Sequence, residues 1–197
     1  QADEARIDFE RAKLENANLS HAKFLTSITN NPSIVTFKDA NLTNADLSGL
    51  KIEQAARGAF GSTTSDLSFE NADLSNADLG DLDVDVEGYD GAKVDLSNAD
   101  LSSADFSNAD IRAKTWIGPA RVKFDGADVT DMDKTGLTVS ASSPHGSGSI
   151  SGLPPTASPP PPTASPPPPT ASPPPTPTAP SPLPLPPDID SSLKDCT

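Results

Sequence analysis

The sequence predicts a solenoid, a fold in which short repeated units stack on one another, and two periodicities support this prediction. The first is a five-residue unit, A(D/N)LXX, which runs from the N-terminus to about residue 130; Ala40-Asn41-Leu42-Thr43 is one copy. A period of five fits neither the 3.6 residues of a helical turn nor the two-residue alternation of a strand. Units repeated at a fixed period bury their apolar residue by stacking on neighbours.

The second periodicity is longer and joins the five-residue units into coils. Similar blocks are centred on Ile7, Val35, Leu67, Val94 and Val122, which lie 28, 32, 27 and 28 positions apart. The first block continues in steps of five through Phe9, Leu14, Leu19 and Phe24. We therefore expect five coils, each of four repeats and an extra segment. The fifth coil loses the pattern after Val129, where Lys134 occupies the next expected apolar position.

These units resemble the pentapeptide-repeat family over roughly residues 5–135. The resemblance implies an all-β fold, a right-handed quadrilateral β-solenoid of about five coils. In that register each face stacks one column of apolar residues at the ~4.8 Å spacing of hydrogen-bonded strands. The first column would contain Phe9, Phe37, Phe69, Leu96 and Phe124.

The extra segments all leave the solenoid at one corner, after the fourth repeat of a coil. They comprise residues 26–34, 54–66, 85–91 and 113–120. Phe60, the single Tyr89 and the single Trp116 lie in them, and we treat these three as candidate interaction residues. Loops often carry function, and aromatic residues are enriched at interfaces. Two interpretations remain open: the aromatics cover one edge of the solenoid, or they form a lateral surface for a partner.

The composition changes after the repeats, which predicts four regions. Residues 1–139 form the solenoid, and residues 140–153 are a Ser/Gly-rich hinge that we expect to be flexible. Residues 154–187 hold 19 of the 22 prolines and should adopt polyproline II, because proline lacks the backbone donor that helices and sheets need. Residues 188–197 are a short C-terminal segment.

The Ser-Pro-Pro-Pro-Pro blocks of the tail resemble the extensins and other hydroxyproline-rich glycoproteins of plant and green-algal walls. That resemblance implies hydroxylated prolines with covalent O-linked glycans, and a location outside the cell, at its surface or in its wall. The candidate modified residues are Pro159, Pro160, Pro161, Pro162, Pro166, Pro167, Pro168, Pro169, Pro173, Pro174, Pro175, Ser158, Ser165 and Ser172. The alternatives are a plain proline-rich linker or a ligand for aromatic-lined grooves.

Other candidate sites carry weaker signals. Asn18 and Asn41 begin N-glycosylation sequons, which ANLS-type repeats also generate by default. Asp83, Asp85 and Glu87 could bind Ca²⁺ weakly beside an extra segment, although the spacing does not match an EF-hand loop. The two histidines, His21 and His145, are not placed as a catalytic base. With no phosphate loop, zinc spacing or nucleophile elbow, we expect neither an enzyme nor a cofactor.

Charge and cysteine content limit the partners. The formal net charge is −14, and residues 1–139 hold 25 acidic and 13 basic residues, which disfavours direct binding of nucleic acid. No apolar run is long enough to span a membrane. The lone Cys196 precludes an internal disulfide. The acidic repeats also resemble pentapeptide-repeat proteins that mimic B-form DNA and bind a topoisomerase, DNA gyrase. The outward acids would be Asp73, Asp78, Asp100, Asp105 and Asp110.

Together these features predict a non-enzymatic, extracellular structural glycoprotein with a rigid solenoid body and a glycosylated tail. The start at Gln1 suits a processed mature protein. The expected partners are other copies, joined head-to-tail or through the tail in a filament, or other wall and surface glycoproteins. The alternatives are a DNA-mimic-like protein that binds a topoisomerase, and a general protein-interaction scaffold.

Overall fold

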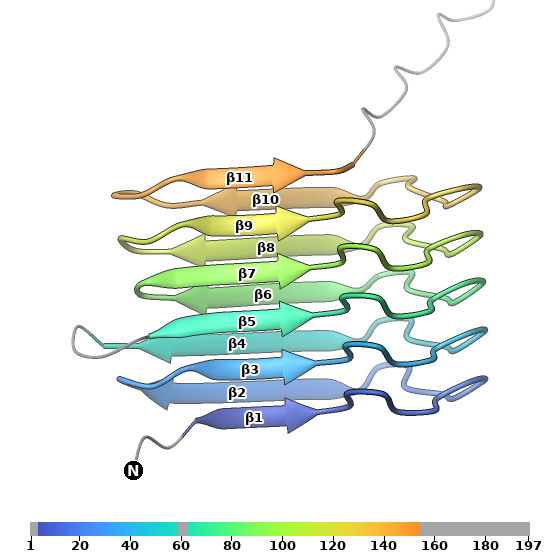
Figure 1. The fold of residues 1–197 in the computed structure, drawn as a ribbon, viewed down its shortest axis with the longest axis horizontal. Helices are drawn as coiled ribbons and strands as arrows, with labels where there is room; N and C mark the ends of the chain where they lie inside the picture. Colours follow the sequence, from blue (N-terminus) through green and yellow to red (C-terminus); the bar gives the residue numbers. More distant parts are fainter. Residues whose placement is uncertain (1–3, 59–62, 154–197) are drawn as a thin grey trace, which may run out of the picture. The chain divides into compact units, whose positions relative to one another are not determined.

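The computed structural model describes residues 4–58 and 63–153, and this part of the chain is all β (Figure 1). The strands are β1 (Ala5–Asp8), β2 (Lys23–Thr29), β3 (Ser33–Thr36), β4 (Lys51–Arg57), β5 (Thr64–Ser68), β6 (Asp83–Gly88), β7 (Gly91–Asp95), β8 (Asp110–Thr115), β9 (Ala120–Lys123), β10 (Thr138–Ser142) and β11 (Gly148–Ser151). Odd-numbered strands form one parallel sheet, in the order β1-β3-β5-β7-β9-β11. Even-numbered strands form a second parallel sheet, in the order β2-β4-β6-β8-β10. We refer to them as the odd sheet and the even sheet.

Narrow turns complete each coil between an odd strand and the next even strand. Single parallel bridges join these turns from coil to coil, as Lys13 pairs with Asn41 and Asn18 pairs with Asp46. The predicted β-solenoid of about five coils is therefore confirmed, and β11 begins a sixth coil. The four sides correspond to the two sheets and the two columns of single bridges, with tight turns between the sides.

The predicted register is also confirmed. The centres pair in the order Ile7, Val35, Leu67, Val94 and Val122 along the odd sheet. The rings of Phe9 and Phe37 stack with centroids 4.9 Å apart, and those of Phe37 and Phe69 with centroids 4.8 Å apart. These distances equal the strand spacing. A narrow core of this kind needs few apolar residues, which fits a chain that is only 34% hydrophobic.

The turns explain the last residue of the five-residue unit. The backbone N–H of Ala45 donates to the Leu42 carbonyl at 2.9 Å and closes a tight turn. Asn44 precedes Ala45 with a φ of 54°, in the left-handed region where Asn, Asp and Gly are favoured. Three such turns occur in each coil. Their left-handed residues are Arg11, Asn16 and His21, then Asp39, Asn44 and Gly49, Asn71, Asn76 and Asp81, Asn98, Ser103 and Asn108, and Gly126, Asp131 and Gly136.

The Asp or Asn before each central residue holds the next residues in place. Asp46 Oδ1 accepts hydrogen bonds from the backbone N–H of Ser48 at 3.0 Å and from its hydroxyl at 2.6 Å. The same arrangement occurs at Asn41 with Thr43, Asp73 with Ser75, Asp95 with Ser97 and Asp128 with Thr130. The A(D/N)LS pattern thus encodes a small inward residue, an outward acceptor, the core residue and a donor.

Residues 140–153, predicted as a flexible hinge, instead continue the solenoid. β10 pairs with β8, and β11 pairs with β9. The fifth coil continues although Lys134 occupies an expected apolar position. Met132, only 7% exposed, fills an inward position that holds Ala in earlier coils. Val139 and Ala141 pack against the core from β10, and Leu153 does so after β11. The ladder needs only backbone pairing and modest inward side chains, so a Ser-rich segment can extend it.

The extra segments mostly lengthen the strands of the even sheet rather than forming separate loops. In every coil 18 positions separate the odd-sheet residue equivalent to Ala5 from the even-sheet residue equivalent to Lys23, as between Ala120 and Thr138 in the fifth coil. The return from the even to the odd sheet spans 10, 14, 9, 10 and 10 positions, from the pairs Lys23/Ser33, Lys51/Ser65, Asp83/Ala92, Asp110/Ala120 and Thr138/Gly148. All variation in coil length therefore occurs at this corner, which we call the loop corner (left side of Figure 1).

The left-handed turns give a stability prediction. Asn76 has a φ of 56° and is exposed. We expect Asn76→Val to lower the free energy of unfolding by about 1–2 kcal/mol, because a β-branched residue is strained in this region, whereas Asn76→Gly should change it little. Urea unfolding followed by circular dichroism measures both. Ser27→Val, on an exposed strand position, is the control and should leave the free energy of unfolding unchanged. Equal stability of the two Asn76 variants would refute the prediction.

Candidate interaction surface

The outer face of the even sheet carries an ion-pair network centred on β6. Asp83 lies 3.2 Å from Lys51 Nζ and 2.6 Å from Arg112 Nη2. Asp85 lies 2.9 Å from Lys114 Nζ, and Glu87 lies 3.7 Å from Arg57. Alternate residues of one strand point to the same side, so the acidic run forms a row flanked by cations of β4 and β8.

The three residues named as a weak calcium candidate, Asp83, Asp85 and Glu87, all belong to this network. Each of the three carboxylates is paired with a Lys or Arg side chain from a neighbouring strand. Across the described ranges, no group of three or more His, Cys, Asp or Glu side chains is arranged to hold a metal ion. The paired cations belong to neighbouring coils, about 30 positions away in the chain, so the local sequence of β6 does not reveal this pairing.

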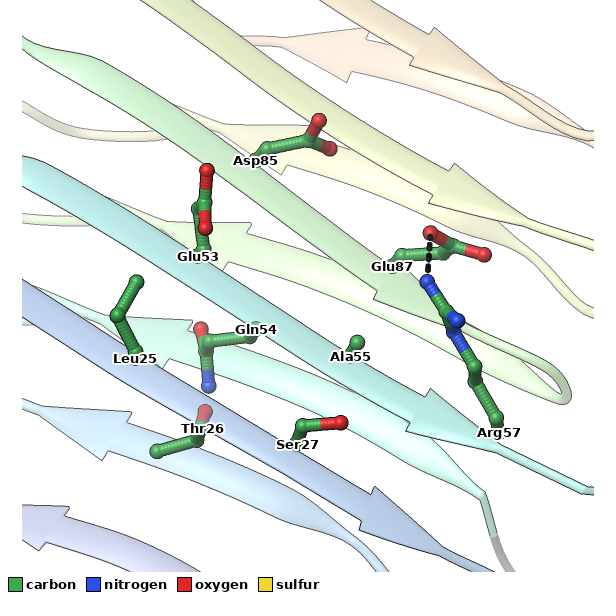
Figure 2. Close-up of a pocket in the computed structure, with 9 residues that line it drawn as sticks. All are labelled: Leu25, Thr26, Ser27, Glu53, Gln54, Ala55, Arg57, Asp85 and Glu87. Atoms are coloured by element: carbon green, nitrogen blue, oxygen red, sulfur yellow. Dashed lines mark ion pairs between the residues drawn. The ribbon is translucent and has the colours of Figure 1, made fainter.

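A shallow depression of about 450 Å³ lies on this face over β2, β4 and β6 (Figure 2). Arg57 reaches toward Glu87 along one side of it, and Leu25 lies at the other end with 59% of its surface exposed. Gln54 is buried below, where its amide nitrogen donates to the carbonyls of Ser33 at 3.3 Å and Asp66 at 3.1 Å. This amide links the two sheets, so its role is structural. The depression is open and mainly polar.

A second depression crosses the ends of β4, β6, β8 and β10 at the loop corner, and we call it the axial groove. Its volume is about 380 Å³. Its lining residues are Ala56, Arg57, Gly58, Glu87, Gly88, Tyr89, Lys114, Thr115, Trp116, Ser142 and Pro144. Strands β4, β6 and β8 each contribute their last two residues and the residue that follows, and β10 contributes its last residue, so the groove runs along the solenoid axis.

The structure brings two of the three predicted interaction residues together in the axial groove. Tyr89 and Trp116 both line it, while Phe60 lies outside the described residues. Trp116 is 53% exposed, and its ring meets the His145 ring edge-on at 5.3 Å between centroids. Ile117 beside it is 44% exposed.

Backbone hydrogen bonds hold this part of the corner in place. The N–H of Ile117 donates to the Tyr89 carbonyl at 3.0 Å, and that carbonyl also accepts the Thr115 hydroxyl at 3.0 Å. The Trp116 N–H donates to Gly88 at 3.3 Å. The aromatic side chains therefore project from turns that are stacked coil on coil, as the strands are.

Sequence reasoning missed the other residues of the groove. Lys114, Ser142 and Pro144 were assigned to an extra segment or to the hinge, yet Lys114 pairs directly with Ser142 in the sheet. Continuing the 28-residue step beyond residue 139 would have placed them together. His145, which contacts Trp116, belongs to the same group.

The outward acids of the turns form two columns. One contains Lys13, Asn41, Asp73, Asp100 and Asp128, and the other contains Asn18, Asp46, Asp78, Asp105 and Asp133. The Ser48 hydroxyl, followed by the Ser48 N–H, lowers the pKa of Asp46. The Thr130 hydroxyl and N–H lower the pKa of Asp128 in the same way. Asp110 lies apart from both columns, in the even sheet, where it pairs with Arg112.

These columns bear on the DNA-mimic interpretation. One oxygen of Asp73, Asp100 or Asp105 accepts a hydrogen bond from the second residue after it, and Asp78 does the same with Gly80. The acids at these positions therefore have a local structural role, because each fixes the backbone two residues after it.

The two sequon asparagines are also used inside the fold. Asn18 donates through its amide to Asp46 Oδ2 at 3.1 Å, and Asn41 donates to Glu15 Oε1 at 3.0 Å. These contacts join neighbouring coils. His21 occupies a left-handed turn of the first coil. The proposed modification sites from Ser158 to Pro175, and Cys196, lie outside the described residues.

Comparison with protein families agrees with this geometry. Residues 92–113, from β7 into β8, match the family model described as Pentapeptide repeats (8 copies). This stretch of the chain therefore matches pentapeptide repeats. Among solved structures, a match is the crystal structure of HetL, a pentapeptide repeat protein involved in heterocyst differentiation regulation from the cyanobacterium Nostoc sp. strain PCC 7120. The identity is 25% and the TM-score 0.14, over 68% of this chain and 63% of HetL, so less than two thirds of HetL is covered. No curated protein matches.

None of the described segments forms a helix that is long and apolar enough to cross a membrane. The surface features that the geometry provides are the charged face of the even sheet, the two acidic columns and the axial groove. Of these three, the axial groove alone combines a concave shape with exposed aromatic surface.

The acidic columns give a prediction about pH. The folded-state pKa of Asp46 is lowered, so its contribution to stability is present above the ordinary Asp pKa of about 3.9 and is lost as the pH falls through the folded value. Ser48→Ala removes the hydroxyl donor and should raise the pKa of Asp46 toward the ordinary value. Carboxyl-detected NMR titration measures this shift. Ser27→Ala, on the even sheet, should leave it unchanged, and an unaltered Asp46 titration in Ser48→Ala would contradict the assignment.

Proposed function

We propose that this protein is a non-enzymatic protein-interaction scaffold that binds its partner at the loop corner. The observation that carries the proposal is the exposure of Trp116 and Ile117 beside the axial groove. Single exposed apolar residues are common on protein surfaces, whereas adjacent ones at a concave site suggest an interface. Tryptophan is also the residue type most enriched among those that dominate binding energy.

The rigidity of the corner supports this proposal. The turns that present Tyr89 and Trp116 are hydrogen-bonded from coil to coil, through Tyr89 to Ile117 and Gly88 to Trp116. A surface that is ordered before binding loses less conformational entropy when a partner docks. The stacked coils thus act as a support whose repeat spacing fixes the positions of the contact residues.

The test is quantitative affinity capture with the double variant Trp116→Ala/Ile117→Ser. We expect the specifically captured partner to be reduced at least about 30-fold, since loss of a dominant aromatic contact costs about 2 kcal/mol or more. Leu25→Ala is the matched control, because Leu25 is equally exposed but lies on the opposite part of the even sheet. If the double variant captures as much partner as the natural protein, the loop corner is not the binding surface.

The tail sequence favours a second, finer proposal, an extracellular structural glycoprotein of the cell surface or wall. The regular Ser-Pro-Pro-Pro-Pro blocks support it, since such blocks are typical of hydroxyproline-rich glycoproteins. Self-association fits this role. Of the described strands, β1 and β11 are the edges of the odd sheet, and Phe9 and Phe24 of the first coil are only partly buried. Exposed strand edges and apolar ends favour association with further chains.

Intact-mass and glycopeptide mass spectrometry of the natively produced protein tests this second proposal. Within residues 154–187 we expect hydroxyproline, which adds one oxygen, about 16 Da, per modified proline. We also expect pentose or hexose additions in the same range. The peptides of residues 63–153 contain no N-glycosylation sequon. They serve as the internal control and should be unmodified. A tail of unmodified mass would reject the glycoprotein and leave the scaffold proposal unaffected.

A further inference from the structure

We infer that the axial groove binds a proline-rich segment of a second copy of this chain, residues 158–162 or 165–169, and that the bound segment takes the polyproline II conformation. The inference rests on the proposed scaffold function, because it names the chemistry of the partner at the same surface. Three properties of the groove support it: its length, its aromatic lining and its charge balance.

The length of the groove fits a run of four prolines. It crosses four consecutive strands of the even sheet, from β4 to β10, and so spans three inter-strand spacings. At ~4.8 Å each, these spacings give about 14 Å. A polyproline II segment rises ~3.1 Å per residue, so about four to five residues fill the groove. The Ser-Pro-Pro-Pro-Pro block has five.

The lining has the chemistry that recognises such segments. Proline-rich ligands dock between aromatic side chains, which pack against the flat pyrrolidine rings. Trp116 and Tyr89 supply the aromatic surface, and Pro144 adds a further apolar contact. The backbone carbonyls of polyproline II have no internal hydrogen bonds, so the indole N–H and the phenol hydroxyl can donate to them.

The charges around the groove favour an uncharged ligand. Arg57 pairs with Glu87 at 3.7 Å, and Lys114 pairs with Asp85 at 2.9 Å. Each charged residue of the lining thus has an opposite charge beside it, and an acidic or basic peptide would gain little net attraction while competing with these pairs. A proline-rich segment is neutral and already extended, which keeps the entropic cost of binding low.

Fluorescence of Trp116, the single tryptophan of the chain, reports on the groove directly. The probe is an unmodified synthetic peptide with the sequence of residues 158–169, SPPPPTASPPPP. It is titrated into the full-length protein and into a full-length variant in which the prolines of residues 158–175 are replaced by serine. The variant carries no competing copy of the ligand. We expect a saturable blue shift of Trp116 emission in the variant, and a smaller response in the natural protein.

Matched variants make the result specific. In the serine-replaced background, Tyr89→Ala should weaken peptide binding at least about tenfold, as loss of an aromatic contact residue does, and Leu25→Ala should leave it unchanged. A peptide of equal length with serine in place of proline should produce no shift. Circular dichroism confirms that each variant is folded.

The outcomes separate this inference from the proposed function. Absence of a saturable shift in the folded serine-replaced protein, or a shift insensitive to Tyr89→Ala, overturns the proline-rich ligand. If affinity capture still depends on Trp116 and Ile117 in that case, the loop corner binds a partner of other chemistry. If capture is also independent of these residues, both proposals fall.

Discussion

The structure depends on parallel pairing that keeps each residue directly above its counterpart in the next coil. At ~4.8 Å per layer, like side chains meet, as the stacked rings of Phe9, Phe37 and Phe69 show. The same constraint aligns the turns, so that the left-handed residues and the Asp-to-Ser hydrogen bonds recur in columns. Each coil is completed by its neighbours, which is why the partly buried apolar residues that pack against the core, such as Phe9 and Val139, lie at the two ends of the described solenoid.

The columns could be predicted from the sequence because the period itself records the register. Coil number, coil length and the Phe and Leu columns all follow from one alignment of the repeats. The C-terminal limit could not be predicted in the same way. Lys134 interrupts the apolar pattern and the residues after it are rich in Ser and Gly, yet Met132, Val139 and Ala141 supply enough inward volume for the ladder to continue.

Contacts between coils explain the other differences between expectation and structure. The acidic run of β6 has the composition of a cation site, but its neighbours in space are Lys51, Arg112 and Lys114 from other coils. The same holds at the loop corner. Composition pointed to Tyr89 and Trp116, whereas the groove that they line also needs side chains from β4 and β10, and only the three-dimensional register assembles it.

Because length varies only at the loop corner, each coil has a constant part that stacks and a variable part at that corner. The 18-residue step that carries the ladders is constant, whereas the return at the corner ranges from 9 to 14 positions. Insertions and deletions at that corner leave the stacking of all other residues untouched. Duplication or loss of a whole coil by recombination would also preserve the stacking of the others, because every coil presents the same interface to the next. Evolution can therefore vary the loop corner independently of the stacked coils that support it.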